Sequence, residues 1–290
     1  MDLSIFLIQV LNSVQYGLTL FLVASGLTLI FGIMGVINLA HGSFYMLGAY
    51  AAYTLTSLTG NLFLAIAPGV ALAIVFGYVL EWIFVSFLYE RSHLQQVLLT
   101  YGLILVFEDL RSLAVGDDVH GVAVPAALSA SIPLGSTMTY PVYNLCISAA
   151  CLVVAALLFV LLRHTRLGMM IRAGASNREM VRSLGIDVGM LFRIVFALGV
   201  ALAAFAGMVA APASSVYPGM GNQVLILCFV VVVIGGIGSV TGALVAALLI
   251  GFVDTFGKVF LPDYSGALVY LLMAVVLVWR PAGLFRETTA

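Results

Sequence analysis

The fold is decided by residues 5–58, a largely apolar stretch that is interrupted at Gly32-Ile-Met-Gly35-Val-Ile-Asn38-Leu-Ala-His41-Gly42. As a single helix this stretch would be about 80 Å long, because each residue adds about 1.5 Å. The hydrocarbon core of a membrane is only about 30 Å thick. The stretch therefore crosses a membrane at least twice, and the glycines and polar side chains of the interruption mark the natural place to turn.

The whole chain has the same apolar character. Of its 290 residues 63% are apolar and 8% are charged, with a formal net charge of −1 and a mean hydropathy of +1.22. Soluble domains carry about 25% charged residues, and so apolar an exterior would aggregate in water. The composition excludes a soluble enzyme, a disordered chain and a nucleic-acid binder, which needs a dense basic patch. Long unbroken apolar runs predict an all-α polytopic membrane protein rather than a β-barrel, whose strands alternate in polarity.

Further apolar runs predict the remaining crossings, at residues 62–88, 94–113, 142–162, 194–211, 224–256 and 267–279. The run at 224–256 is itself interrupted, at Gly235-Gly236-Ile-Gly238-Ser239-Val-Thr241-Gly242. The spacings Ala203-x-x-x-Gly207 and Ala247-x-x-x-Gly251 predict close packing between helices. We expect a single transmembrane domain, residues 1–290, with about nine crossings, or eight or ten if an interruption lies at mid-depth.

The distribution of basic residues predicts the orientation. Six of the eleven lie in the loop 163–193, and cytoplasmic loops are rich in Lys and Arg, so this loop is expected inside. The loop 114–142 contains neither residue and is expected outside. Arg280 is expected inside by the same rule. An odd number of crossings then places the N-terminus outside.

The two interruptions are the candidate substrate path. Broken backbone at membrane depth persists only where it is buried in protein or lines a cavity. Half-helix ends there offer free N–H and C=O groups to a small polar substrate. The candidate lining residues are Gly35, Asn38, His41, Gly42, Gly236, Gly238 and Thr241. The alternative is a tight helical hairpin in which Asn38 and His41 only satisfy the turn.

No catalytic, metal or cofactor site is expected. The three cysteines lie in apolar runs without a CxxC pair, which is typical of small buried side chains. His41 has no second metal ligand at a usable spacing, and a membrane-embedded enzyme that uses His41 would lack a second catalytic group. A Walker A motif is absent from the sequence, so ATP, if it drives this protein, is hydrolysed by another subunit.

Charged residues within apolar runs are functional candidates by default. Two pairs have helical spacing, Glu108 with Arg111 and Asp254 with Lys258, and the second pair is expected near the outer face. Glu81 is expected to reach the inner boundary. These residues are few for a proton- or sodium-driven pump, but an ion-coupled secondary transporter remains the alternative function.

The cytoplasmic loop predicts one short amphipathic helix within residues 173–187. Ser176 and Glu179 have the S-x-x-E spacing of a capping box, which would fix its start. Gly185 would supply the left-handed residue that stops it. The apolar stripe of this helix would consist of Met180, Val181 and Leu184. Two arginines, Arg178 and Arg182, would flank it. Such a helix lies either in a groove of a partner protein or on the lipid interface.

Three segments, residues 26–50, 166–187 and 231–242, resemble the permease subunits of branched-chain amino acid ABC importers of the LivH type. The resemblance implies the ABC importer permease fold, a non-enzymatic subunit of the bacterial inner membrane, and no cofactor. It implies as partners a second, LivM-like permease, two cytoplasmic ATPases and a periplasmic substrate-binding protein.

The resemblance also identifies residues 176–184 with the family's coupling helix, which favours docking of its apolar stripe on an ATPase. The same family includes permeases for urea, short amides and aromatic acids. The three segments do not distinguish these substrates.

Overall fold

The computed structural model describes residues 3–89, 91–134 and 138–285. Its long helices are α1 (Leu3–Met34), α2 (His41–Thr59), α3 (Leu62–Ile83), α4 (His93–Val115), α5 (Val142–His164), α8 (Val188–Ser214), α9 (Met220–Gly235), α10 (Val240–Phe260) and α11 (Ser265–Trp279). Shorter elements connect them: η1 (Val85–Leu88), η2 (Ala126–Leu128), β1 (Ser131–Pro133), β2 (Thr139–Pro141), α6 (Arg166–Ser176), α7 (Arg178–Ser183) and η3 (Pro262–Tyr264).

The long helices fill the ranges in which the sequence predicts crossings. Six are long and apolar enough to cross a membrane, namely α1, α3, α5, α8, α10 and the segment Pro262–Trp279 that contains α11. The apolar helix α9 is shorter, with 16 residues. Within the described ranges, α2 and α4 lie in the two remaining segments that are expected to cross. The prediction of a polytopic α-helical membrane protein is confirmed, whereas the number of nine crossings stays a prediction.

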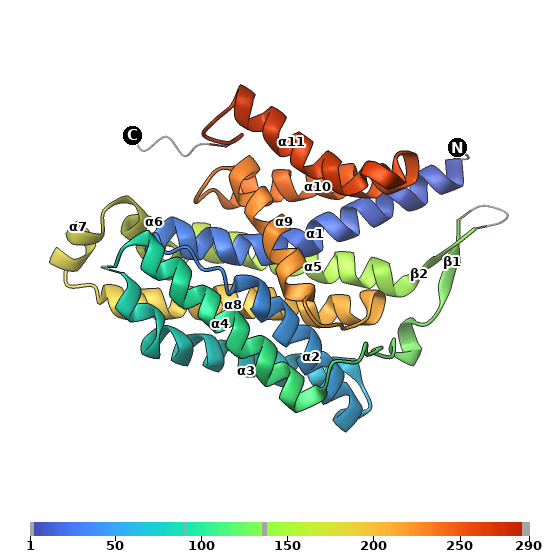
Figure 1. Cartoon of the computed structure of the whole chain (residues 1–290), viewed down its shortest axis with the longest axis horizontal. Coiled ribbons are helices and arrows are strands. Elements are labelled where there is room, and N and C mark those ends of the chain that lie inside the picture. The colour runs from blue at the N-terminus through green and yellow to red at the C-terminus, as the bar shows by residue number, and fades with distance from the viewer. Residues whose placement is uncertain (1–2, 90, 135–137, 286–290) are drawn as a thin grey trace.

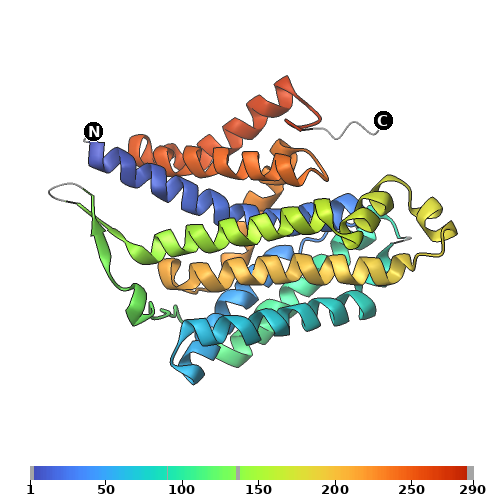
Figure 2. The same cartoon turned by 180° about the vertical axis from the view of Figure 1, so that it is seen from behind.

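The molecule is elongated, with α6 and α7 at one end and the β1–β2 hairpin at the other (Figure 1). From behind, α3 (cyan) and α8 (yellow to orange) run side by side, and α5 (lime) lies next to α8 (Figure 2). The start of α1 lies at the hairpin end. We call the two ends the loop-helix end and the hairpin end; the charge distribution predicts that they are cytoplasmic and external, respectively.

Both predicted interruptions are confirmed. The helix α1 ends at Met34 and α2 begins at His41, with Gly35 in the left-handed region at φ +64°. We call residues 35–40 the first break. The helix α9 ends at Gly235 and α10 begins at Val240, and residues 236–239 form the second break. A side chain would strain the backbone at the positive φ of Gly35, which explains why a glycine ends the first helix.

The loop 116–141 is more structured than the sequence indicates. Its strands β1 and β2 pair antiparallel, with Ser131 opposite Pro141. Its first part is tied to the loop after α8 by an isolated bridge between His120 and Val216. Strands of three residues are too short to produce a recognisable alternation of polarity, so an all-α prediction misses them.

Glycines allow the core helices to approach closely, as the small-residue spacings predict. A methyl group on Gly207 of α8 would lie 2.0 Å from the carbonyl oxygen of Tyr45 in α2. One on Gly251 of α10 would lie 2.4 Å from the carbonyl oxygen of Ser13 in α1. The interfaces of α2 with α8 and of α1 with α10 therefore depend on the absence of side chains at these positions.

We expect Gly207→Ala to destabilise the protein by about 1–3 kcal/mol, because the added methyl group overpacks the contact between α2 and α8. Thermal unfolding in mild detergent measures the effect. Gly102→Ala in α4 is the matched control, since nothing lies within 4 Å of its added methyl group; it should be neutral or slightly stabilising. Equal melting temperatures for the two variants would contradict the packing argument.

Candidate functional site

Asn38 organises the first break from within. Its side-chain Oδ1 accepts a hydrogen bond from the backbone N–H of Ala40 at 3.1 Å, and its carbonyl oxygen accepts one from the N–H of His41 at 3.3 Å. The residue is buried, and its Nδ2 has no hydrogen-bond partner in the described ranges. Asn38 therefore closes the turn that leads into α2, and it leaves one amide nitrogen available.

His41 joins α2 to α1. It is fully buried, and its Nε2 lies 2.9 Å from the carbonyl oxygen of Val23. A carbonyl can only accept, so Nε2 carries the proton and Nδ1 is the unprotonated nitrogen. The ring also meets Phe44 edge-on at 5.9 Å between centroids. These contacts hold the His41 ring between α1 and α2.

Helix α4 provides hydrogen-bond partners for the backbone of the first break. The N–H of Ile37 lies 3.4 Å from Oε1 of Gln96, and the hydroxyl of Thr100 lies 3.5 Å from the carbonyl oxygen of Ile37. Both side chains are buried. The sequence analysis missed Gln96 and Thr100, although two polar residues four positions apart in an apolar run are a visible signal.

The last turn of α1, directly before the first break, lies against the second break. A methyl group on Gly32, in the last turn of α1, would lie 2.8 Å from Cα of Gly238 in the second break. Ser239 then caps α10 by accepting a hydrogen bond from the N–H of Gly242 at 3.1 Å. The hydroxyl of Thr241 lies 3.2 Å from that of Ser239, and Thr241 is exposed.

The segment after α11 completes the second break. The N–H of Leu284 donates to the carbonyl oxygen of Ile234 at 2.8 Å, and the N–H of Phe285 donates to that of Gly235 at 3.1 Å. Any side chain at Gly236, whose φ is +99°, would collide with the carbonyl oxygen of Phe285. Residues 280–285 therefore pair with the open end of α9, a contact that the sequence analysis did not predict.

The candidate path residues are mostly enclosed in this conformation. Asn38, His41, Gly42 and Gly236 are buried, while Gly35 and Gly238 are partly exposed and Thr241 is exposed. Gly42 packs on α9, where a methyl group would lie 2.1 Å from the carbonyl oxygen of Gly221. The structure brings the end of α1, next to the first break, onto the second break. The role of these residues in lining a path stays a prediction.

The cytoplasmic loop forms two helices where one was predicted. Ser176 is the last residue of α6, and Asn177 is the cap of α7, with its Oδ1 accepting from the N–H of Met180 at 2.9 Å. The predicted capping box of Ser176 and Glu179 is therefore wrong. Asn and Ser are equally good caps, and the extended backbone of Asn177 places the start one residue later.

The predicted end of this helix is confirmed. Gly185 is left-handed at φ +82°, and its N–H donates to the carbonyl oxygen of Arg182 at 3.0 Å. The N–H of Ile186 donates to the carbonyl oxygen of Val181 at 3.3 Å. These two bonds form a Schellman motif, which fixes the end of α7.

The apolar stripe of α7 is divided between two environments. Val181 is 2% exposed and anchors the helix. Met180 is 59% exposed and Leu184 is 72% exposed. The helix is thus capped at both ends and anchored on one side, and it presents two large apolar side chains outward.

Arg178 connects α7 to the end of α1. A methyl group on Gly35 would lie 2.9 Å from its Nη2, so the guanidinium rests directly on the first break. The guanidinium carbon also lies 5.4 Å from the centroid of the Phe192 ring, a cation–π contact with α8. Arg178 therefore contacts both the first break and α8 from α7.

Glu81 has partners inside the protein, at the end of the molecule that is expected to be cytoplasmic. It is fully buried in α3, the hydroxyl of Tyr89 donates to its Oε1, and the Nε of Arg193 lies 3.6 Å from its Oε2. Tyr89 meets the ring of Phe192 at 5.0 Å. This cluster joins α3, the loop before α4 and α8 at the loop-helix end.

Both predicted ion pairs are confirmed. Lys258 Nζ lies 2.6 Å from Asp254 Oδ2, and Arg111 Nη2 lies 3.3 Å from Glu108 Oε2. Among the described residues, no group of three or more His, Cys, Asp or Glu side chains could hold a metal ion.

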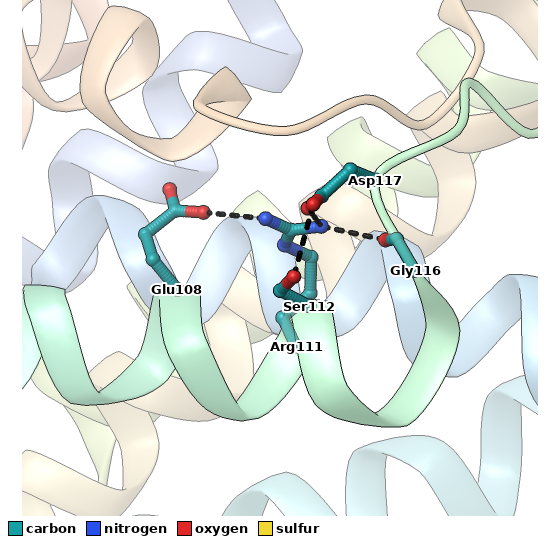
Figure 3. Close-up of polar contacts among 5 residues, drawn as sticks. All are labelled: Glu108, Arg111, Ser112, Gly116 and Asp117. Atoms are coloured by element: carbon teal, nitrogen blue, oxygen red, sulfur yellow. Dashed lines mark hydrogen bonds and ion pairs between the residues drawn. The ribbon is translucent and has the colours of Figure 1, made fainter.

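Arg111 holds the start of the loop 116–141 at the hairpin end (Figure 3). Its Nη1 donates to the carbonyl oxygen of Gly116 at 2.7 Å and to Oδ1 of Asp117 at 2.8 Å. The hydroxyl of Ser112 donates to the other oxygen of Asp117 at 3.1 Å. Hydrogen bonds from Arg111 and then from Ser112 hold the pKa of Asp117 below its usual range.

We expect Asp117→Asn to lower the melting temperature at pH 6, and the difference from the unmodified protein to shrink as the pH falls. A carboxylate with a lowered pKa stabilises the folded state above its unfolded pKa of about 3.9, and this contribution is lost as the pH falls through the folded pKa. Thermal unfolding in detergent between pH 6 and pH 3 measures it. Asp118→Asn, which removes the adjacent exposed carboxylate, controls for charge; a difference independent of pH would contradict the assignment.

Comparison with known proteins identifies relatives of this chain. The sequence model of the branched-chain amino acid transport system permease component matches residues 9–277. The permease BraD of a high-affinity branched-chain amino acid transport system in Pseudomonas aeruginosa is 30% identical, over 96% of this chain and 95% of that protein. The corresponding permease LivH of Escherichia coli is 28% identical over the same shares.

A more distant relative is the ribose import permease RbsC of Escherichia coli, which is 28% identical over 80% of this chain and 72% of its own length. A solved structure, PsaBC from Streptococcus pneumoniae in complex with Fab, covers 92% of this chain and 89% of that chain, but its TM-score of 0.45 and 11% identity are too low to extend the argument. The match over residues 9–277, together with BraD, shows that the chain belongs to the family of permease components of branched-chain amino acid transport systems.

Proposed function

We propose that this chain is a permease subunit of an ATP-driven ABC importer in a bacterial inner membrane and that the importer moves branched-chain amino acids into the cell. A second, LivM-like permease would complete the membrane path. Two cytoplasmic ATPases would supply the energy, and a periplasmic binding protein would deliver the substrate. The family membership supports the permease role, and the architecture of α7 carries the proposal that ATPases drive it.

The helix α7 has the properties of a docking element. Its caps and the buried Val181 hold it in a fixed orientation, whereas Met180 and Leu184 project from it. Large apolar side chains on a rigid exposed helix favour a partner surface that removes them from water. Lipid headgroups would suit this helix less well, because Arg178 lies against Phe192 and Gly35.

The connection from α7 to the breaks gives such docking a consequence. Arg178 contacts Gly35 at the end of α1, and Gly32 contacts Gly238 in the second break. When ATP binding draws the ATPases together, a displacement of α7 would be passed to both breaks. We propose that the breaks shift as a pair and open the path along the interface with the second permease.

The proposed substrate class is taken from the relatives that match nearly the whole chain. BraD and LivH, which are named for branched-chain amino acid transport, align with 96% of it, whereas the ribose permease aligns with 80%. The runner-up substrates are urea, short amides and aromatic acids. Uptake of radiolabelled leucine against ribose and urea, by the complete complex in proteoliposomes, separates these possibilities.

Docking on α7 is tested by purifying the complex from its native membranes and identifying the proteins that accompany this chain by mass spectrometry. We expect ATPases to be recovered with the unmodified chain. Met180→Asp combined with Leu184→Asp should reduce their recovery about tenfold or more, because two apolar anchors are replaced by charges. Met138→Asp, at an exposed methionine of the hairpin end, is the control. Full recovery with the double variant would overturn the docking proposal.

The proposal that a displacement of α7 is passed to the first break is tested with Gly35→Ala. We expect leucine uptake to fall about tenfold while the ATPases remain bound, because the methyl group displaces Arg178 and strains the backbone. Gly60→Ala is the matched control, since its φ of +69° imposes the same strain but nothing lies within 4 Å. A similar loss in both variants would show that strain alone is responsible.

A further inference from the structure

A polar cavity of about 630 Å³ opens at the hairpin end, between α1, α5, α8 and α10. Its volume is within the range of small-molecule sites. Most of its lining side chains can form hydrogen bonds, among them Gln9, Asn12, Gln15, Asn144, Asp254 and Lys258. Residues near the start of α1 line this cavity, and α1 begins at the opposite end of the molecule from α7 (Figure 1).

The cavity contains one charge of each sign. Lys258 Nζ lies 2.6 Å from Asp254 Oδ2 and 5.6 Å from the centroid of the Tyr16 ring. The Lys258 side chain is 62% exposed, whereas that of Asp254 is 12% exposed. The ammonium group is therefore reached from water, and the carboxylate lies deeper in the wall.

We propose that this cavity is an external binding site for a zwitterionic α-amino acid, a proposal that rests on the function proposed above. The α-carboxylate would bind the ammonium of Lys258, and the α-ammonium would bind the carboxylate of Asp254. The amide side chains of Gln9, Asn12 and Asn144 supply neutral hydrogen-bond partners around this head group.

Exchange of partners makes such binding energetically accessible. The Lys258 ammonium is largely exposed, so water weakens its attraction to Asp254 and competes for it. Two charge-assisted hydrogen bonds to the ligand can replace it without leaving either charge unpaired. A ligand with a single charge would leave Asp254 or Lys258 without a partner, which disfavours simple acids and amines.

The remaining wall suits an aliphatic side chain. Val124, Pro212 and Val259 line the same cavity and provide apolar surface beside the polar groups. A sugar could form hydrogen bonds with the amides and with both charged groups, but it carries no charge to pair with either of them. The combination of both charges with an apolar wall therefore favours a neutral aliphatic amino acid.

Uptake of radiolabelled leucine by the complete complex, driven by ATP in the presence of the binding protein, tests the site. Asp254→Asn and Lys258→Met should each raise the KM about tenfold, because one end of the zwitterion loses its partner. The double variant should remain defective. If the pair is only structural, removing both charges should restore uptake, and that result would overturn the proposal. Asp263→Asn, an exposed acid outside the cavity, is the matched control.

Direct occupancy is tested by labelling Thr255→Cys, a cavity residue, with a membrane-impermeant thiol reagent. The partly exposed Cys146 is first replaced by Ser, whereas Cys151 and Cys228 are buried. Millimolar leucine should slow the labelling, and 4-methylvalerate and isoamylamine, which each lack one charge, should not. Equal protection by all three compounds, or by none, would overturn the site.

These results separate failure of the site from failure of the proposed function. Absence of leucine uptake by the unmodified complex would refute the function. Normal uptake by Asp254→Asn and Lys258→Met, without protection of the cysteine by leucine, would refute only the site.

Discussion

The structure depends on pairing the backbone groups that the first break removes from its helices. Inside a membrane an unpaired N–H or C=O group costs several kcal/mol, so the chain can leave a helix only where other groups replace the lost bonds. Asn38 supplies them from within the break, and Gln96 and Thr100 supply them from α4. The positions of α1, α2 and α4 are therefore linked at this point, and the second break is held against the end of α1 through the contact of Gly32 with Gly238.

The two ends of the molecule have different physical characters. At the loop-helix end, a continuous set of contacts joins α7, α8 and α3. Arg178 forms a cation–π contact with Phe192, the Phe192 ring meets the ring of Tyr89, and the Tyr89 hydroxyl donates to Glu81. At the hairpin end, Arg111 fixes the loop 116–141 through charge-assisted bonds. Under the proposed function, the loop-helix end would receive force from the ATPases and the hairpin end would receive solute.

Local signals in the sequence were sufficient to place the helices and both breaks. Long apolar runs give the spans, and glycines that need positive φ, such as Gly35, give the interruptions. The same signals did not locate the start of α7, because Ser176 and Asn177 are both suitable caps and the choice depends on where α6 ends. Contacts between distant segments, such as Arg178 on Gly35 or Arg193 beside Glu81, leave no local pattern, so they could not be predicted from the sequence.

The pairing of Leu284 and Phe285 with the end of α9 has a consequence for biogenesis. The carbonyl groups of Ile234 and Gly235 are synthesised fifty residues before the N–H groups that bind them. At typical translation rates of about 5–20 residues per second, they wait roughly 3–10 seconds for their partners. During this interval α10 and α11 are made while the junction between α9 and α10 is still open. The junction is complete only when residues 284 and 285 have been added, so a chain that stops before them leaves these two carbonyl groups without their partners.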